Sequence, residues 1–314
     1  MMSQQVLGDL GCPVAAFRDD LVRHGHLLPT GVDGLYGRGE AFERVVAGVD
    51  ALVGRLADGD RVEVLRFPPV MTRSGFEASG YFRNFPQLTA GVSCFCGDDA
   101  EHRRALACTA EEGGFASRMQ PADVMLTPAS CYPVYPIVAA RGLLPEDGWL
   151  VDSSSYCFRR EPSVDPVRMQ MFRQREQVCF GSPEQIRAFQ SRWMTRAMAM
   201  FERLGLPAVT DLANDPFFGR AAPLMRDGQR SQRLKFEILV PISDPTLRNA
   251  CGSFNYHVTH FAEAYGIHAA DGSLAHSGCA GFGLERIVLA LMRQHGLRVA
   301  DWPGEVQAVL WPAV

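Results

Sequence analysis

Apolar side chains recur every three or four residues in two parts of the chain, which predicts two amphipathic helices. Between Glu40 and Ala57 they form one stripe: Phe42, Val45, Val46, Val49, Leu52, Val53 and Leu56. The second helix opens at Ser182-Pro183-Glu184-Gln185, a capping box with proline in its first turn, and ends at Gly205. A shorter helix is expected around Val14–His24, within an otherwise irregular stretch.

Alternation of apolar and polar residues predicts strands elsewhere. The expected strands are Arg61–Phe67, Asp123–Thr127, Trp149–Tyr156 and Arg233–Ile242, with a weaker signal over Ser253–Gly266. Strands outnumber helices in the second half of the chain, and they lack the strand–helix–strand rhythm of a parallel sheet. The pattern therefore predicts an α+β fold, an antiparallel sheet flanked by helices, rather than a Rossmann fold.

The stretch from Phe158 to Glu176 predicts an antiparallel hairpin. With a period of two, Arg159 and Glu161 share one face of the first strand. One face of the returning strand carries Arg168, Gln170, Phe172, Gln174 and Glu176. Cations, a flat ring and carboxylates on one surface suit a nucleoside triphosphate. The alternative interpretation is an exposed hairpin whose charges are solvated.

A second motif, Gly281-Phe-Gly-Leu-Glu-Arg286, predicts a short strand that turns into a buried helix, with Arg286 near the helix start. Phe-Arg-x-Glu, Arg-x-x-x-Phe-x-x-x-Glu and this hexapeptide, in this order, resemble the second and third signature motifs of class II aminoacyl-tRNA synthetases. The helix and strand that lead into Pro68-Pro69 resemble the first motif, which builds the dimer interface. The resemblance implies the class II catalytic fold and a homodimer.

Composition narrows the class of protein. At 314 residues, with 47% hydrophobic and 21% charged residues, the chain is typical of a soluble globular protein. The net charge of −4 shows no general basic footprint for nucleic acid. We find no signal peptide and no apolar run that could cross a membrane. Nine cysteines without a framework of short spacings predict a reducing cytoplasm, with strand packing expected for Cys94 and Cys96.

Three residues far apart in the sequence form a candidate metal site: Cys131, Glu176 and Cys279. In ordinary seryl-tRNA synthetases, the segment similar to Thr127–Cys131 carries a Thr-x-Glu element that holds the substrate amine. Here the glutamate is missing, and a cysteine follows. The set resembles the Cys, Glu, Cys zinc site of atypical archaeal seryl-tRNA synthetases, which implies Zn²⁺ with an open position for a free amino group. On residue chemistry alone, burial in the core is the alternative for each cysteine.

The size of the chain points to one branch of the family. Residues 1–60 hold no heptad repeats of a coiled coil, and the 28 residues after Arg286 are too few for an anticodon-binding domain. Such a core is similar to the amino acid:[carrier protein] ligases. The resemblance implies activation of glycine or alanine as an aminoacyl-adenylate, and its transfer to the phosphopantetheine thiol of a carrier protein. It implies an irregular and helical extension over 1–60 and a catalytic domain over 61–314, with 206–232 as the candidate carrier-docking segment.

The same resemblance implies roles for individual residues. Arg159 would hold the α-phosphate, Glu161 would accept from the adenine amine, and Phe172 would stack on adenine. Arg168 and Arg286 would bind the β- and γ-phosphates. The remaining nucleotide contacts would be Met169, Lys235 (the one lysine beside thirty arginines) and the turn Ala250, Cys251, Gly252 and Ser253. Glu176 would serve both zinc and the substrate amine. ATP is expected with Mg²⁺, although Ala250 replaces a magnesium-binding glutamate and Glu237 is the candidate substitute.

Two other functions stay open from the sequence. One is a minimal tRNA-aminoacylating enzyme that recruits a separate tRNA-binding protein. The other is a non-catalytic sensor of ATP or an amino acid. A tRNA enzyme should carry a basic groove, and the charge balance does not favour one, so no tRNA partner is expected.

Overall fold

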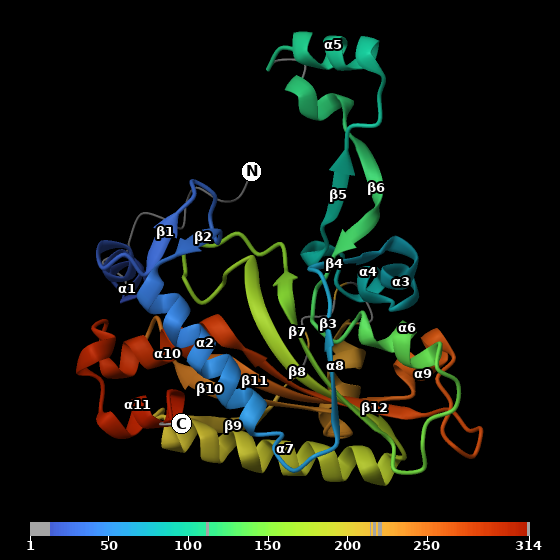
Figure 1. Ribbon diagram of the computed structural model, residues 1–314, viewed down its shortest axis with the longest axis vertical. Coiled ribbons are helices and arrows are strands. Elements are labelled where there is room, and N and C mark those ends of the chain that lie inside the picture. The colour runs from blue at the N-terminus through green and yellow to red at the C-terminus, as the bar shows by residue number, and fades with distance from the viewer. Residues whose placement is uncertain (1–12, 111–112, 214, 216–217, 219–221, 313–314) are drawn as a thin grey trace.

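A seven-stranded sheet forms the centre of the computed structural model, which describes residues 13–110, 113–213, 215, 218 and 222–312 (Figure 1). Its strands, in order across the sheet, are β3 Val62–Arg66, β7 Trp149–Phe158, β8 Met171–Gly181, β12 His276–Gly283, β11 Arg248–Val258, β10 Lys235–Pro241 and β9 Val209–Leu212. Only the β3–β7 pair is parallel. The predicted antiparallel sheet flanked by helices is therefore confirmed.

One face of the sheet is covered by long helices. The helices α7 Pro183–Arg203, α10 Leu284–His295 and α2 Glu40–Arg55 share a core with Phe254 and Phe282 of the sheet. The expected capping box begins α7: the Ser182 hydroxyl and the Gln185 side chain each bond the other residue's backbone N–H. The same core takes in Phe17 of α1 Pro13–Arg23, and α11 Gly304–Leu310 packs beside α2. The two-stranded sheet β1 Leu27–Pro29 and β2 Tyr36–Arg38 joins α1 to α2.

The other face is covered by short elements. These are α3 Arg73–Ala78, α4 Tyr81–Asn84, η1 Pro86–Leu88, α6 Val134–Ala139, α8 Ala222–Ser231 and α9 His260–Tyr265. Tyr135 of α6 stacks on Phe261 of α9 with ring centroids 3.9 Å apart, and both pack against Phe180 of β8 in a second apolar cluster. Short elements leave room for a cavity over the sheet, whereas the long helices fill the opposite face.

A projecting arm was not predicted from the sequence. The strands β4 Val70–Thr72, β5 Gly91–Cys94 and β6 Gln120–Leu126 form a small sheet, and β5 and β6 carry α5 Asp99–Ala107 and η2 Gly114–Arg118 away from the body (Figure 1). Cys94 is the last residue of β5, but both Cys94 and Cys96 are exposed, so the expected packing of their side chains is wrong. A further short helix, η3 Val299–Asp301, lies between α10 and α11 in the chain. Within the described ranges, no helix has the length and apolar character needed to cross a bilayer.

Several predicted boundaries are wrong. The hairpin strands end at Phe158 and resume at Met171, so the connection is much longer than the predicted loop. The predicted turn at 250–253 lies inside β11, because Gly252 and Ser253 pair with strands on both sides. The weak strand expected over Ser253–Gly266 ends at Val258, whose backbone has a positive φ of 53°, and continues as α9. The segment 206–232, expected to be loop, contains β9 and α8.

Candidate active site

A cavity of about 550 Å³ lies on the face of the sheet that the short elements cover. All of the predicted site residues except Arg168 line it: Cys131, Arg159, Glu161, Met169, Phe172, Glu176, Lys235, Ala250, Cys251, Gly252, Ser253, Cys279 and Arg286. These residues come from segments as far apart as 131 and 286 in the sequence. The fold therefore gathers the predicted residues around one space.

Strand register determines which side chains form the floor of the cavity. Gly281 of β12 has a partner on each neighbouring strand: Glu176 of β8 on one side and Ser253 of β11 on the other. Asn255 of β11 lies opposite Cys279. Because side chains alternate between the two faces of a sheet, these residues all face the cavity. A Cβ atom on Gly281 would lie 2.9 Å from Glu176 Oε1, so glycine leaves room for this carboxylate.

Arg159 and Phe172 lie together beside the end of the hairpin. The Arg159 N–H donates to the Gln170 carbonyl at 2.9 Å, which continues the pairing one residue beyond β7. Its guanidinium carbon lies 5.5 Å from the Phe172 ring centroid, and its Nε donates to the Pro128 carbonyl at 3.1 Å. The predicted phosphate ligand and the predicted base-stacking ring are thus neighbours.

Arg286 reaches the same cavity from the first turn of α10. Its Nε donates to the Val167 carbonyl at 2.8 Å, and its Nη1 donates to the Ala250 carbonyl at 2.9 Å. Burial lowers the pKa of this guanidinium from its usual value, with the nearby charge of Arg159 acting in the same direction. Among the described residues, neither Arg159 nor Arg286 forms an ion pair with a carboxylate. Their positive charges remain available to an anionic ligand.

Arg168 does not share the cavity face. It is exposed and lies in the connection between β7 and β8, where the two-residue period of a strand does not apply. A turn forms there because the Asp165 carboxylate accepts from the Val167 N–H and from the Ser243 hydroxyl. The prediction that placed Arg168 on the strand face is wrong, and its phosphate role stays a prediction.

Lys235 is buried in the cavity wall and already paired. Its Nζ lies 2.5 Å from Asp215 Oδ1 and 3.1 Å from Glu237 Oε1. Burial alone would lower the pKa of Lys235, but the charges of Asp215 and Glu237 raise it above its usual value. Gln229 of α8 and Asp215 exchange two hydrogen bonds of 2.8 Å each. Sequence reasoning missed Asp215, because its partner is twenty residues away on another element.

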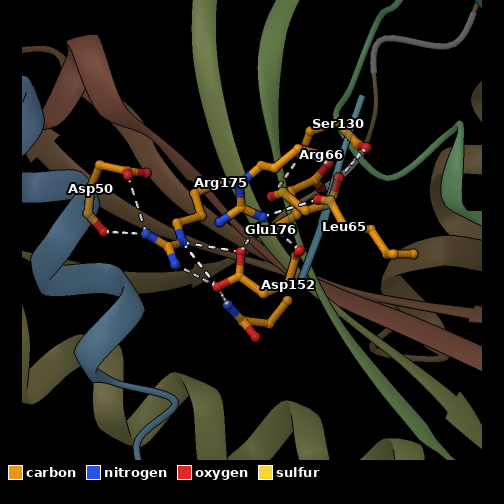
Figure 2. Close-up of polar contacts among 9 residues, drawn as sticks. Asp50, Leu65, Arg66, Ser130, Asp152, Arg175 and Glu176 are labelled. Atoms are coloured by element: carbon orange, nitrogen blue, oxygen red, sulfur yellow. Dashed lines mark hydrogen bonds and ion pairs between the residues drawn. The ribbon is translucent and has the colours of Figure 1, made fainter. Parts of the chain in front are cut away.

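The three candidate metal ligands converge. One ligand atom each from Cys131, Glu176 and Cys279 lies within 4.8 Å of the others, and all three residues are buried. Glu176 Oε2 accepts from the Ser130 hydroxyl at 2.9 Å (Figure 2). The same oxygen accepts from the Cys131 N–H at 2.7 Å. Those two bonds fix the carboxylate and leave Oε1 as the oxygen that can bind a cation.

The donor set fits zinc. Two cysteine sulfurs and one carboxylate oxygen are ligands that zinc prefers, and three protein ligands leave a position for a substrate. A ligand distance of about 2.0–2.3 Å allows separations of the size found here. The hydrogen-bonded neighbour Cys279, burial and the charge of Glu176 together raise the pKa of Cys131 well above its usual value. A divalent cation among these acidic groups would reverse that effect.

Two further residues near Cys279 were missed from the sequence. The Asn255 Nδ2 atom lies 3.3 Å from Cys279 Sγ, and the His257 Nε2 atom lies 3.6 Å from the same sulfur. Asn255 and His257 follow Ser253 at intervals of two residues along β11. The weak strand signal over this segment was the available clue, but the pairing with β12 could not be read from it.

Comparison with known proteins agrees with this geometry. A profile described as the tRNA synthetase class II core domain (G, H, P, S and T) matches residues 116–295. Two proteins of Bradyrhizobium diazoefficiens, named amino acid–[acyl-carrier-protein] ligase 1 and 2, are 43% and 44% identical to the chain over 280 residues. The match covers 89% of the chain, and 86% and 84% of those two proteins. The chain belongs to the amino acid–[acyl-carrier-protein] ligase family.

This ligase family member has the class II synthetase core fold. A crystal structure of M. kandleri SerRS in complex with A. aeolicus tRNASec matches 94% of the chain with a TM-score of 0.80 at 20% identity. The chain spans 60% of that structural relative, and the likeness concerns the fold. The expected class II fold and the expected ligase family are therefore confirmed, and the alternative of a non-catalytic sensor is not retained.

Proposed function

We propose that this ligase activates a small amino acid, glycine or alanine, with ATP and transfers it to the phosphopantetheine thiol of a carrier protein. The observation that carries the proposal is one cavity that holds the guanidinium groups of Arg159 and Arg286 together with a cluster of two cysteines and a glutamate. Neither guanidinium forms an ion pair with a carboxylate of the described residues. The names of the two Bradyrhizobium relatives support the choice of acceptor.

The proposed chemistry has two steps. An oxygen of the amino acid carboxylate attacks the α-phosphorus of ATP, the new P–O bond forms, and pyrophosphate leaves. The thiol sulfur then attacks the acyl carbon, the thiol proton is released, and AMP leaves with the electron pair of the broken C–O bond. Both steps develop negative charge on phosphate oxygens, so catalysis rests on positioning and on fixed positive charge.

Each residue of the cavity has a proposed part in these steps. Arg159 stabilises the α-phosphate, Phe172 stacks on adenine, and Glu161 accepts from the adenine amine. Arg286 holds the pyrophosphate that leaves, and Mg²⁺ accompanies ATP as its counter-ion. Zinc, when bound by Cys131, Glu176 and Cys279, supplies a Lewis acid that holds the neutral amine of the substrate. The Tyr132 and Phe261 rings in the cavity wall support a small side chain on that substrate.

The partner surfaces are also part of the proposal. Within 206–232, the described residues Asp215, Gly228, Gln229 and Gln232 line the cavity, which supports carrier-protein docking beside α8. A homodimer through α2 and β3 is supported by the position of β3 at the edge of the sheet, where 60% of Val64 is exposed.

Acceptor choice tests the function directly. Labelled glycine or alanine, ATP, bulk tRNA and a phosphopantetheinylated carrier protein are offered together, and we expect label on the carrier. Label on tRNA would overturn the proposal in favour of a tRNA-aminoacylating enzyme.

The metal site is tested by Cys131→Ser, with Cys94→Ser on the exposed arm as the matched control. We expect Cys131→Ser to lose amino acid-dependent pyrophosphate exchange while its circular dichroism spectrum is unchanged, and Cys94→Ser to keep both. Exchange at the wild-type rate in Cys131→Ser would remove the metal from the proposed mechanism.

A further inference from the structure

Cys279 has two nitrogen neighbours on the adjacent strand. Asn255 lies directly opposite it in the β11–β12 ladder, a position in which cross-strand side chains on one face touch. The Asn255 Nδ2 atom lies 3.3 Å from Cys279 Sγ and also 3.3 Å from the Ser253 hydroxyl. His257, two residues farther along β11, places its Nε2 atom 3.6 Å from the same sulfur. The register of two strands thus brings two side-chain nitrogens to one thiol.

The His257 nitrogen that faces the sulfur is Nε2, and the partners of Nδ1 bear on whether Nε2 carries the ring proton. Its Nδ1 lies 3.2 Å from the Tyr135 hydroxyl and 3.2 Å from the Ser277 hydroxyl. Burial lowers the pKa of His257 to about 3, so the ring is neutral and carries one proton. When the Tyr135 or Ser277 hydroxyl donates to Nδ1, that nitrogen is the acceptor and the proton is on Nε2. In this tautomer an N–H group points at Cys279.

Cys131 and Cys279 differ in the side-chain nitrogens that lie near their sulfur atoms. In the part of the chain that the structure describes, no N–H group donates to Cys131 Sγ. The Cys131 backbone N–H instead donates to Glu176 Oε2. Hydrogen bonds from N–H groups draw electron density from a sulfur, so the two cysteines are not equivalent ligands.

We propose that Asn255 and His257, the latter with its proton on Nε2, are positioning residues that hold the Cys279 sulfur in the orientation that binds zinc, with Tyr135 and Ser277 orienting the His257 ring. The inference rests on the metal site of the proposed function. By drawing electron density from Cys279, the two N–H groups keep the bound cation electron-poor, which favours binding of a neutral amine. Partners of this kind commonly contribute a factor of about 10–100 to metal affinity.

Zinc affinity, measured by competition with a chromophoric chelator on the purified full chain, tests the proposal. We expect His257→Phe and Asn255→Ala each to bind zinc about 10–100-fold more weakly than the wild type. His257→Gln, which keeps a side-chain N–H donor, should recover part of the loss. His276→Gln is the matched control, because His276 lies on β12 near Cys279 but contacts Tyr256 instead. The control should bind zinc like the wild type.

A spectroscopic measurement separates this role from a general loss of structure. With Co²⁺ in place of zinc, the thiolate-to-cobalt absorption should shift in folded Asn255→Ala and His257→Gln, because an N–H donor to the sulfur is lost or changed. If His257→Phe does not fold, Asn255→Ala decides the outcome.

The two possible failures are distinguishable. A wild-type chain that binds no zinc would overturn the metal site and this inference together. A wild type that binds one zinc per chain, with variants of equal affinity and an unchanged cobalt spectrum, would overturn the role of Asn255 and His257 alone.

Discussion

The two faces of β8 use charged residues in opposite ways. Arg173 and Arg175 point away from the cavity, and each is held by carboxylates. Figure 2 shows Arg175 between Asp50 of α2 and Asp152 of β7. Its Nη2 atom lies 2.7 Å from Asp152 Oδ2. On the cavity face, the guanidinium groups of Arg159 and Arg286 donate to backbone carbonyls instead.

This difference separates structural charge from functional charge. A guanidinium that is paired with a buried carboxylate joins elements of the fold, as Arg175 joins α2, β7 and β8. A guanidinium fixed only by carbonyl groups keeps its full charge for a ligand. Lys235 is intermediate, because it lines the cavity and yet contacts two carboxylates. A phosphate ligand would have to compete with Asp215 and Glu237 for it.

The largest expected effect comes from removing an arginine on the face of β8 that points away from the cavity. Arg175→Ala leaves the buried Asp152 carboxylate without its main partner, and loss of one member of a buried pair costs about 3–5 kcal/mol. Only 11% of the Arg175 side chain and 3% of that of Asp152 are exposed. We therefore expect the free energy of unfolding, measured by urea denaturation, to fall by that amount.

Arg66→Ala is the control for this prediction. Arg66 Nη1 lies 3.0 Å from the same carboxylate, but 43% of the Arg66 side chain is exposed. Solvent screens such a pair, so we expect a loss below about 1 kcal/mol. Equal losses in the two variants would show that burial does not distinguish these arginines.

Substitution of an arginine on the cavity face should lower the activity more than the stability. Arg159→Ala removes a fixed positive charge from the cavity, and the loss of one such group typically lowers the rate by about 10²–10³-fold. We expect amino acid-dependent pyrophosphate exchange to fall by this factor. The free energy of unfolding should change by no more than about 2 kcal/mol, because the side chain loses one hydrogen bond to a carbonyl and its contact with the Phe172 ring.

Arg160→Ala provides the matched control, since Arg160 is the adjacent residue but is exposed and does not line the cavity. It should keep both rate and stability. A pyrophosphate-exchange rate that is unchanged in Arg159→Ala, or reduced equally in both variants, would contradict a special role for Arg159.

Sequence reasoning succeeded where local periodicity decides the outcome. The stripe over Glu40–Ala57 closely matches α2, and the alternation Phe172, Gln174 and Glu176 correctly placed three side chains on one face of β8. It failed at Arg168, because periodicity ends where the strand ends. The family resemblance, rather than spacing, brought Cys131, Glu176 and Cys279 together.

Other features could not be read from one sequence at all. The contact of His257 with Cys279 depends on the register of β11 against β12, and that register is fixed by the packing of the whole sheet. The pair Asp215–Lys235 and the network of Arg175 with Asp50 and Asp152 depend in the same way on long-range contacts.

The smallest expected effect is the pH dependence of the stability contributed by the Arg173–Glu43 pair. Hydrogen bonds from Arg173 lower the pKa of Glu43 below its usual value of 4.5. A carboxyl whose folded-state pKa is lowered contributes stability above its unfolded pKa, and this contribution disappears as pH falls through the folded value. Since 41% of the Glu43 side chain is exposed, the contribution should stay below about 1 kcal/mol.

Glu43→Gln should therefore be slightly less stable than the wild type at pH 7, and the difference should vanish as urea denaturation is repeated at decreasing pH below 4.5. Glu40→Gln, in the same first turn of α2 but exposed, is the control for the helix dipole. The two variants should differ at neutral pH and converge in acid, because protonated Glu43 no longer offers Arg173 a charge. A difference that stays constant over the whole pH range would show that Glu43 stabilises the protein through packing rather than through its charge interaction with Arg173.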